Sequence, residues 1–182
     1  MFRKLMIVGS VVAAAVAAFA ATSYAIRPNT KPRLRSNLAV ANRPAVSLDH
    51  GTAVTFNNVI GADNLSRFGI TTASYDQARV VARTSAGVAY LIPGSRGACL
   101  VFAVEASCGD PGAPGASGAS MLALATVRSG KLVGAGITTD AKHVVTISSP
   151  HGLVAKAAVS NGAFSVTGKA PVHPIGLEFA AR

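Results

Sequence analysis

The chain has 182 residues, half of them apolar, with no tryptophan and a formal net charge of +10. The length suits one domain, and the apolar content excludes a chain that is disordered because of its composition. The charge is uneven, because from Pro44 to the C-terminus ten Lys and Arg residues stand against seven Asp and Glu, a net charge of only +3. A nucleic-acid-binding domain carries its basic stripe on the fold, so we expect no nucleic-acid partner.

The first 25 residues have the pattern of an export segment. A basic start precedes an apolar run from Leu5 to Phe19, and both Ser23-x-Ala25 and Ala18-x-Ala20 fit the small-x-small rule for signal-peptide cleavage. An uncut anchor is the alternative, since Leu5 to Ala25 is long enough to span a bilayer, and a buried helix is a third. We therefore expect residues 1–25 to be a helical signal peptide or N-terminal membrane anchor, which contacts the membrane if it is uncleaved.

Residues 26–44 have the composition of a basic, proline-rich linker. Three prolines oppose both helix and sheet, and the like charges repel one another. One interpretation is a solvated spacer. The other is contact with an anionic surface through its basic side chains, which are Arg27, Lys31, Arg33 and Arg35.

The domain is expected to occupy residues 45–182 and to begin with short elements. Ala53 to Phe56 is a possible strand, and Asp63 to Phe68 predicts a helical turn ended by Gly69. Ser74-x-x-Gln77 matches a capping box, which predicts a short helix from Tyr75. The β-branched pair Val80-Val81 then favours extended chain.

Strand signals dominate the rest of the chain. Short apolar runs alternate with turn residues such as Pro93-Gly94, Ser129-Gly130 and Asn161-Gly162. This pattern predicts a mainly β domain, a small antiparallel β-sandwich or barrel-like fold with one or two short helices. The expected strands are Val88–Ile92, Ala98–Glu105, Leu122–Val127, Lys131–Ile137, His143–Ser148, Leu153–Val159, Ala163–Thr167 and Ile175–Phe179.

The last hairpin is specific enough to predict its register. A two-residue Asn161-Gly162 turn pairs Ser160 with Ala163, Val159 with Phe164 and Ala157 with Val166. Strict alternation then places the apolar side chains on one face, Leu153 with them, and leaves the other face wetter. That second face carries Lys156, Ser165 and Thr167.

Cys99 and Cys108 are the only cysteines of the chain. In an exported protein such a pair predicts a disulfide, whereas two buried free thiols are the alternative. Their spacing differs from the Cys-x-x-Cys of redox motifs. We expect the chain to fold back just past Glu105 to bring the two together.

The sequence indicates no catalytic, cofactor-binding or metal-binding residues. The histidines, His50, His143, His151 and His173, show no metal-ligand spacing. No serine lies in a nucleophile elbow. The acidic residues that could supply a catalytic pair of carboxylates are scattered along the sequence, namely Asp76, Glu105, Asp110 and Glu178. We therefore expect no cofactor, and an exported non-enzymatic domain that binds or scaffolds an unknown ligand at the cell surface. The alternative is an envelope hydrolase whose site is dispersed in the sequence.

A stretch of about ninety residues resembles a group of known proteins. Its features are the turn segment Ala89–Leu100, the later Cys108 and the Gly134-Ala-Gly-Ile137 run. Together they resemble uncharacterised exported proteins of high-GC Gram-positive bacteria over residues 75–168. The chain departs from that group at Thr139-Asp140-Ala141, where relatives often have Pro-Asp-Gly. The resemblance implies an extracytoplasmic location and a disulfide, and no activity.

Overall fold

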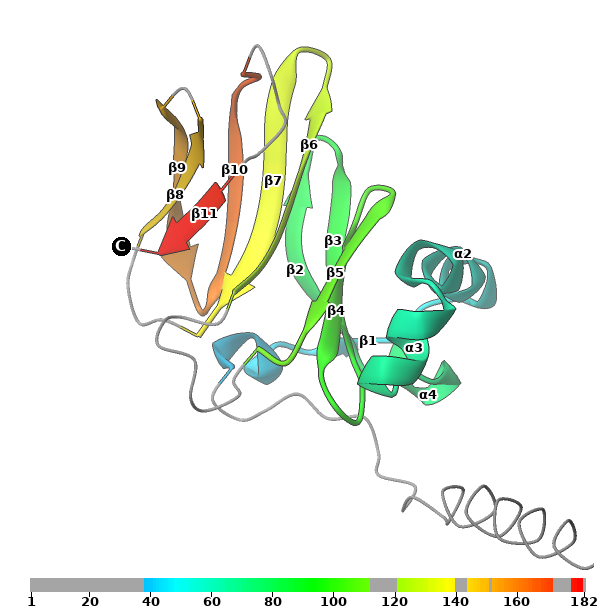
Figure 1. The fold of residues 1–182 in the computed structure, drawn as a ribbon. Coiled ribbons are helices and arrows are strands. Elements are labelled where there is room, and N and C mark those ends of the chain that lie inside the picture. Colours follow the sequence, from blue (N-terminus) through cyan, green and yellow to red (C-terminus); the bar gives the residue numbers. More distant parts are fainter. Residues whose placement is uncertain (1–37, 112–120, 140–143, 151, 172–177, 182) are drawn as a thin grey trace, which may run out of the picture. The chain divides into compact units, whose positions relative to one another are not determined.

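The computed structural model describes residues 38–111, 121–139, 144–150, 152–171 and 178–181 (Figure 1). Two antiparallel sheets dominate them, which confirms the expected mainly β class. The expected N-terminal helix in residues 1–25 and most of the expected linker lie outside the described residues, as do Arg27, Lys31, Arg33 and Arg35. The helices described are the 3-10 helix η1 (Ala39–Asn42), α2 (His50–Ile60), α3 (Ala62–Phe68) and α4 (Thr72–Tyr75), more than the one or two short helices expected from the sequence.

The strands form one five-stranded and one six-stranded sheet. The first has the order β1 (Ala45–Val46), β2 (Ala78–Thr84), β3 (Gly87–Pro93), β4 (Ala98–Phe102) and β5 (Glu105–Gly109). The second has the order β11 (Glu178–Ala181), β8 (Val144–Ser149), β9 (Gly152–Ser160), β10 (Ala163–Lys169), β7 (Lys131–Thr138) and β6 (Met121–Arg128).

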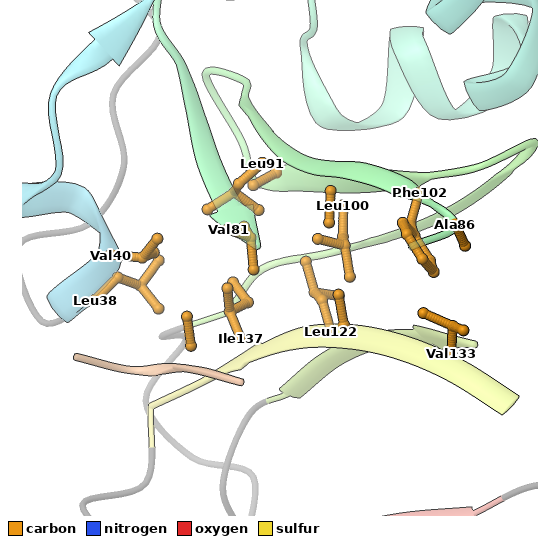
Figure 2. Close-up of a cluster of buried hydrophobic side chains, with 14 residues drawn as sticks. Leu38, Val40, Val81, Ala86, Leu91, Leu100, Phe102, Leu122, Val133 and Ile137 are labelled. Carbon is orange, nitrogen blue, oxygen red and sulfur yellow. The ribbon is translucent and has the colours of Figure 1, made fainter. Parts of the chain in front are cut away.

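The main hydrophobic core lies between the two sheets (Figure 2). Leu91, Leu100 and Phe102 enter it from the five-stranded sheet, and Val133 and Ile137 enter it from the six-stranded sheet. Two side chains that precede β1, those of Leu38 and Val40, are also fully buried there. The end of the segment interpreted as a linker therefore belongs to the packed domain.

Two further clusters cover the outer faces of the sheets. Along β4 the residues alternate between the main core and a second cluster, in which Cys99 and Val101 pack beneath α2 and α4 with Phe56, Ile60 and Tyr75. A strand buried on both faces reads as a continuous apolar run. This burial explains the sequence Ala98-Cys-Leu-Val-Phe102.

The third cluster lies within the six-stranded sheet. Leu132, Phe164 and Val166 point away from the main core and pack with Val145 and Ile147 of β8. Because β8 belongs to the same sheet, the sheet must curl for these side chains to meet. Phe179 of β11 completes the cluster, with its ring centroid 6.3 Å from that of Phe164.

Two local predictions in the helical region were wrong. Ala53–Phe56 is not a strand but part of α2, whose Asp49 cap accepts a hydrogen bond from the Thr52 backbone N–H at 2.9 Å. The predicted helix from Tyr75 ends there instead, because α4 is capped by Thr71 together with Ser74. The turn ended by Gly69 is confirmed, with Gly69 left-handed at φ 66°.

Most strand predictions are confirmed, with two corrections. The first residue of the predicted strand His143–Ser148 and the first three of Ile175–Phe179 lie outside the described residues, and β8 and β11 account for the rest. The run Ala98–Glu105 is not one strand, because the chain turns at Ala103-Val104, just before Glu105, and returns as β5. In the last hairpin the Ser160–Ala163 and Val159–Phe164 pairs are confirmed, with left-handed Asn161 and Gly162. The predicted Ala157–Val166 ladder pair is not formed: β9 pairs with β10 only next to the turn and with β8 over most of its length.

Candidate functional site

A β-bulge shapes the outer surface of the β8–β9 hairpin. Ile147 pairs with Ala155 but Ser148 pairs with Leu153, so Val154 is left without a partner on β8. A bulge of this kind re-aims the side chains that follow it. Val154 turns inward to the third cluster, whereas Leu153 turns outward and is 59% exposed. The predicted placement of Leu153 on the buried face is therefore wrong.

The re-aimed leucine borders a hollow of about 550 Å³. A hollow of this size is typical of small-molecule sites. Alternate residues of β8 and three residues of β9 line it, namely Val144, Thr146, Ser148, Gly152, Leu153 and Lys156. The predicted wet face of the hairpin is confirmed here, because Lys156 is exposed while Phe164 on the other face is buried.

The polar groups of the hollow are two hydroxyls and one ammonium. Thr146 is buried and its Oγ1 donates to the Ala180 carbonyl oxygen at 3.1 Å, which ties β8 to β11. Ser148 and Lys156 present their polar atoms beside the apolar Val144 and Leu153. Glu178 of β11 pairs with Ser148, so it stands on the same face of the sheet. Glu178 does not line the hollow, however, so the lining combines apolar side chains with the cationic Lys156 and suits a compound with an apolar part and an anionic group.

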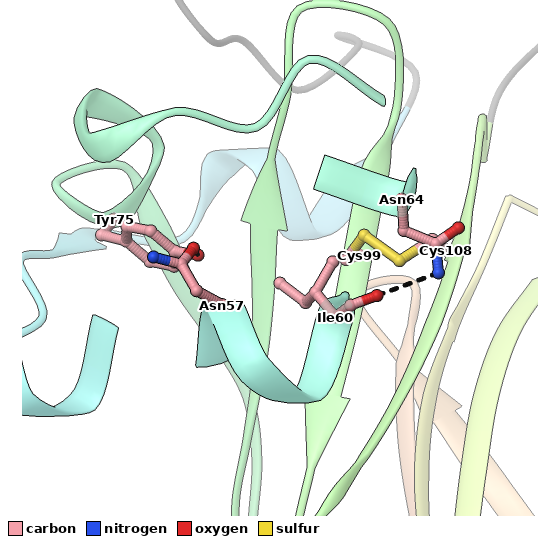
Figure 3. The surroundings of a disulfide bond; sticks show 6 residues. All are labelled: Asn57, Ile60, Asn64, Tyr75, Cys99 and Cys108. Atoms are coloured by element: carbon pink, nitrogen blue, oxygen red, sulfur yellow. Dashed lines mark hydrogen bonds between the residues drawn. A yellow bond between two sulfur atoms is a disulfide. The ribbon is translucent and has the colours of Figure 1, made fainter. Parts of the chain in front are cut away.

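The predicted disulfide between Cys99 and Cys108 is confirmed (Figure 3). The two cysteines face each other across β4 and β5, with Cα atoms 4.1 Å apart. Cys99 is fully buried, and Ile60 and Asn64 lie beside the bond. Asn64 Nδ2 donates to the Ile60 carbonyl oxygen at 3.0 Å, which holds the junction of α2 and α3 over the disulfide. This burial indicates a structural bond.

Tyr75 and Asn57 form a partly buried polar contact between two of the helices. The Tyr75 hydroxyl donates to Asn57 Oδ1 at 2.5 Å, which links α4 to α2. Burial raises the pKa of Tyr75. The contact lies inside the second cluster and satisfies a hydroxyl that would otherwise be buried alone.

Comparison of the chain with protein-family models, curated proteins and solved structures finds no match. The site therefore rests on geometry alone.

Of the other residues considered in the sequence, those that the structure describes do not line the hollow. His50 is exposed at the start of α2, whereas His143, His151 and His173 lie outside the described residues. Asp76 accepts a hydrogen bond from Ser47 Oγ at 2.6 Å, far along the chain from Glu105 and Asp110. Within the ranges that the structure describes, no three His, Cys, Asp or Glu side chains gather in a way that could hold a metal ion. The helices among these same residues include none long and apolar enough to cross a membrane.

The hollow was not predicted from the sequence, because side chains were expected to alternate between the two faces without a break along β9. Three consecutive apolar residues, Leu153-Val-Ala155, break the two-residue period just before Lys156. Such a run is compatible with a bulge but does not specify one, because Ala157-Ala158-Val159 in the same strand is equally apolar and is paired regularly. It identifies an outward apolar residue only when the partner strand is known.

Proposed function

We propose that the chain is exported and that its β domain is a non-enzymatic binding domain at the cell surface. The ligand binds in the hollow on the outer face of β8 and β9. The observation that carries this proposal is the bulge that exposes Leu153 beside Lys156. An outward leucine gains nothing from the fold, whereas a ligand that covers it removes apolar surface from water.

The export half of the proposal is supported by the signal-like first 25 residues and by the disulfide. Disulfides persist in oxidising compartments and are rare in the cytoplasm. The Cys99–Cys108 bond is therefore compatible with an extracytoplasmic location. Mature protein that starts at Ala21 or Ile26 would support cleavage, and intact Met1 in membrane fractions would favour an anchor.

The ligand class follows from the lining of the hollow. Leu153 and Val144 favour an apolar group, and the exposed Lys156 ammonium favours an anion within reach of it. Neither side chain alone selects the compound. We therefore assign the hollow to amphiphilic anions, in which a carboxylate, sulfonate or phosphate adjoins a hydrocarbon part.

The binding test uses two dyes that differ in charge. Anilinonaphthalene sulfonate has an apolar ring system and one anionic group, and phenylnaphthylamine lacks the anion. We expect Leu153→Ser to abolish the saturable part of the fluorescence increase with both dyes. We expect Lys156→Gln to weaken the affinity for the sulfonate dye alone by about tenfold, which is the effect of one charge-assisted hydrogen bond.

Matched controls come from the helices that cover the five-stranded sheet. Val54 is 44% exposed on α2 and Arg67 is exposed on α3, and neither lines the hollow. Val54→Ser and Arg67→Gln should leave both dye titrations unchanged. Equal responses of the Leu153 and Val54 variants would contradict the assignment.

One observation keeps the hydrolase alternative testable. Ser148 and Lys156 line the same hollow, and a lysine can activate a serine nucleophile in some hydrolases. Activation needs a hydrogen bond between the serine hydroxyl and the lysine amine, and within the described part of the chain no such bond joins Ser148 to Lys156. We therefore expect Ser148→Ala to leave any hydrolysis of p-nitrophenyl esters unchanged, and a loss of hydrolysis would favour the enzyme.

A further inference from the structure

Three basic residues stand in a row at one end of the six-stranded sheet. Arg128 pairs with Lys131 across β6 and β7, and Lys131 pairs with Lys169 across β7 and β10. Paired residues of antiparallel strands point to the same face, and like charges directly opposite each other are destabilising. All three side chains are exposed. A bound anionic partner would remove this repulsion.

The row has no internal neutralisation in the part of the chain that the structure describes. None of the three side chains forms an ion pair there, and Arg128 Nη1 donates instead to the Ala86 carbonyl oxygen at 3.2 Å. Ala86 lies in the turn between β2 and β3. This bond therefore places the β6–β7 turn beside the β2–β3 turn.

Large apolar side chains are exposed at the same end of the domain. Val127 is 42% exposed next to Arg128 in the sequence, and because it pairs with Leu132 it points to the opposite face of the sheet from the basic row. Val104 is 82% exposed in the turn between β4 and β5. Because β2 to β5 are consecutive antiparallel strands, the β2–β3 and β4–β5 turns lie at one end of their sheet. We call this end of the domain, which carries Val104, Val127, Arg128, Lys131 and Lys169, the hairpin-tip surface.

The combination of charges and valines selects among anionic partners. A soluble polyanion would neutralise the row but leave both valines in water. A bilayer with anionic headgroups would also accept the valines at the headgroup–acyl boundary. We propose that the hairpin-tip surface docks on bilayers that contain anionic phospholipids. This proposal goes beyond ligand binding in the β8–β9 hollow and does not depend on it.

The absence of tryptophan from the chain makes the contact directly measurable. In the full chain, Val127→Trp introduces a single tryptophan at the hairpin-tip surface. With vesicles of phosphatidylcholine and phosphatidylglycerol whose acyl chains are dibrominated, its fluorescence should shift to the blue and be quenched. Vesicles of phosphatidylcholine alone should give at least tenfold weaker quenching at the same lipid concentration.

Val54→Trp is the matched reporter, because Val54 is exposed to a similar extent, 44%, but belongs to α2 and not to the hairpin-tip surface. This tryptophan should stay unquenched even if the apolar N-terminal segment holds the chain on the vesicle. In the Val127→Trp background, Lys131→Gln and Lys169→Gln should each lower the apparent affinity for anionic vesicles about fivefold. Arg67→Gln on α3 should leave that affinity unchanged.

Two results would overturn the proposal. Equal quenching of the two tryptophans would show that proximity, rather than the hairpin-tip surface, brings them to the lipid. A blue shift of the Val127→Trp variant with soluble polyphosphate, without quenching by brominated anionic vesicles, would assign the row to a polyanion instead. Circular dichroism of each variant confirms that the sheets are intact, so that loss of quenching reports on binding.

Discussion

At the residue scale, the absence of a side chain decides how the third cluster packs. Gly136 of β7 pairs with Phe164 of β10, and the aromatic ring lies over the glycine. A Cβ atom at position 136 would stand 2.3 Å from Phe164 Cζ. The Gly134-Ala-Gly-Ile137 run therefore makes room for an aromatic side chain. From the sequence alone, this run contributed only to a resemblance.

We expect Gly136→Ala to lower the free energy of unfolding by about 1 to 3 kcal/mol, because overpacking forces Phe164 or the backbone to move. Urea denaturation measures this change. Gly168→Ala on β10 is the control, since its Cβ would meet Ala155 Cβ at an ordinary 3.5 Å. If both variants had the same stability, the close contact of Phe164 with Gly136 would not limit packing.

At the element scale, neighbouring contacts overrode local propensity. The segment Ala53–Phe56 has a composition compatible with a strand, yet Asp49 caps a helix that runs on to Ile60. The side-chain and backbone hydrogen bonds of Thr52 lower the pKa of Asp49, so the cap is ionised at neutral pH. Phe56 and Ile60, four residues apart, place their side chains on one helix face against the sheet.

A covalent bond also acts between elements, because the disulfide joins β4 to β5 beneath α2. Closing a loop with a sequence separation of nine residues should stabilise the domain by about 2 to 3 kcal/mol. We expect a reductant to lower the free energy of unfolding by this amount in urea denaturation. The Cys99→Ala/Cys108→Ala variant should be insensitive to reductant. Titration of unreduced, denatured protein should find no free thiol, and two reactive thiols would refute the bond.

At the scale of the whole molecule, three hydrophobic clusters are stacked through two sheets. The core is rich in alanine and valine, so each side chain buries little surface and many are needed. Segments far apart in sequence contribute to it. Arg43 also connects segments that are distant in sequence, since its Nη1 donates to the carbonyl oxygens of Val80 and Val81 in β2 at 2.9 and 2.6 Å.

The main core also tests where the domain begins. Leu38 is only 1% exposed between the sheets, so Leu38→Ala should lower the free energy of unfolding by about 2 to 5 kcal/mol. Asn42→Ala, on the exposed side of η1, should change it by less than about 0.5 kcal/mol. Thermal or urea unfolding of the full chain measures both. A Leu38 variant as stable as the wild type would mean that residues 38–44 are a spacer after all.

The sequence by itself determined the features that depend on local chemistry. The turns at Ser129-Gly130 and Asn161-Gly162 follow from residues that tolerate positive φ, and all four adopt it. The pairing of Cys99 with Cys108 follows from there being only two cysteines. The antiparallel strands follow from short apolar runs between such turns.

Only the tertiary structure decided which surface each strand presents. The bulge opposite Ile147 and Ser148, the curl that brings β8 over Phe164, and the burial of Leu38 all depend on contacts between distant segments. Alternation within one strand cannot specify them, because a single inserted residue reverses the faces of all that follow. For this reason the hollow beside Leu153 and the basic row of Arg128, Lys131 and Lys169 emerge only when the strands are paired.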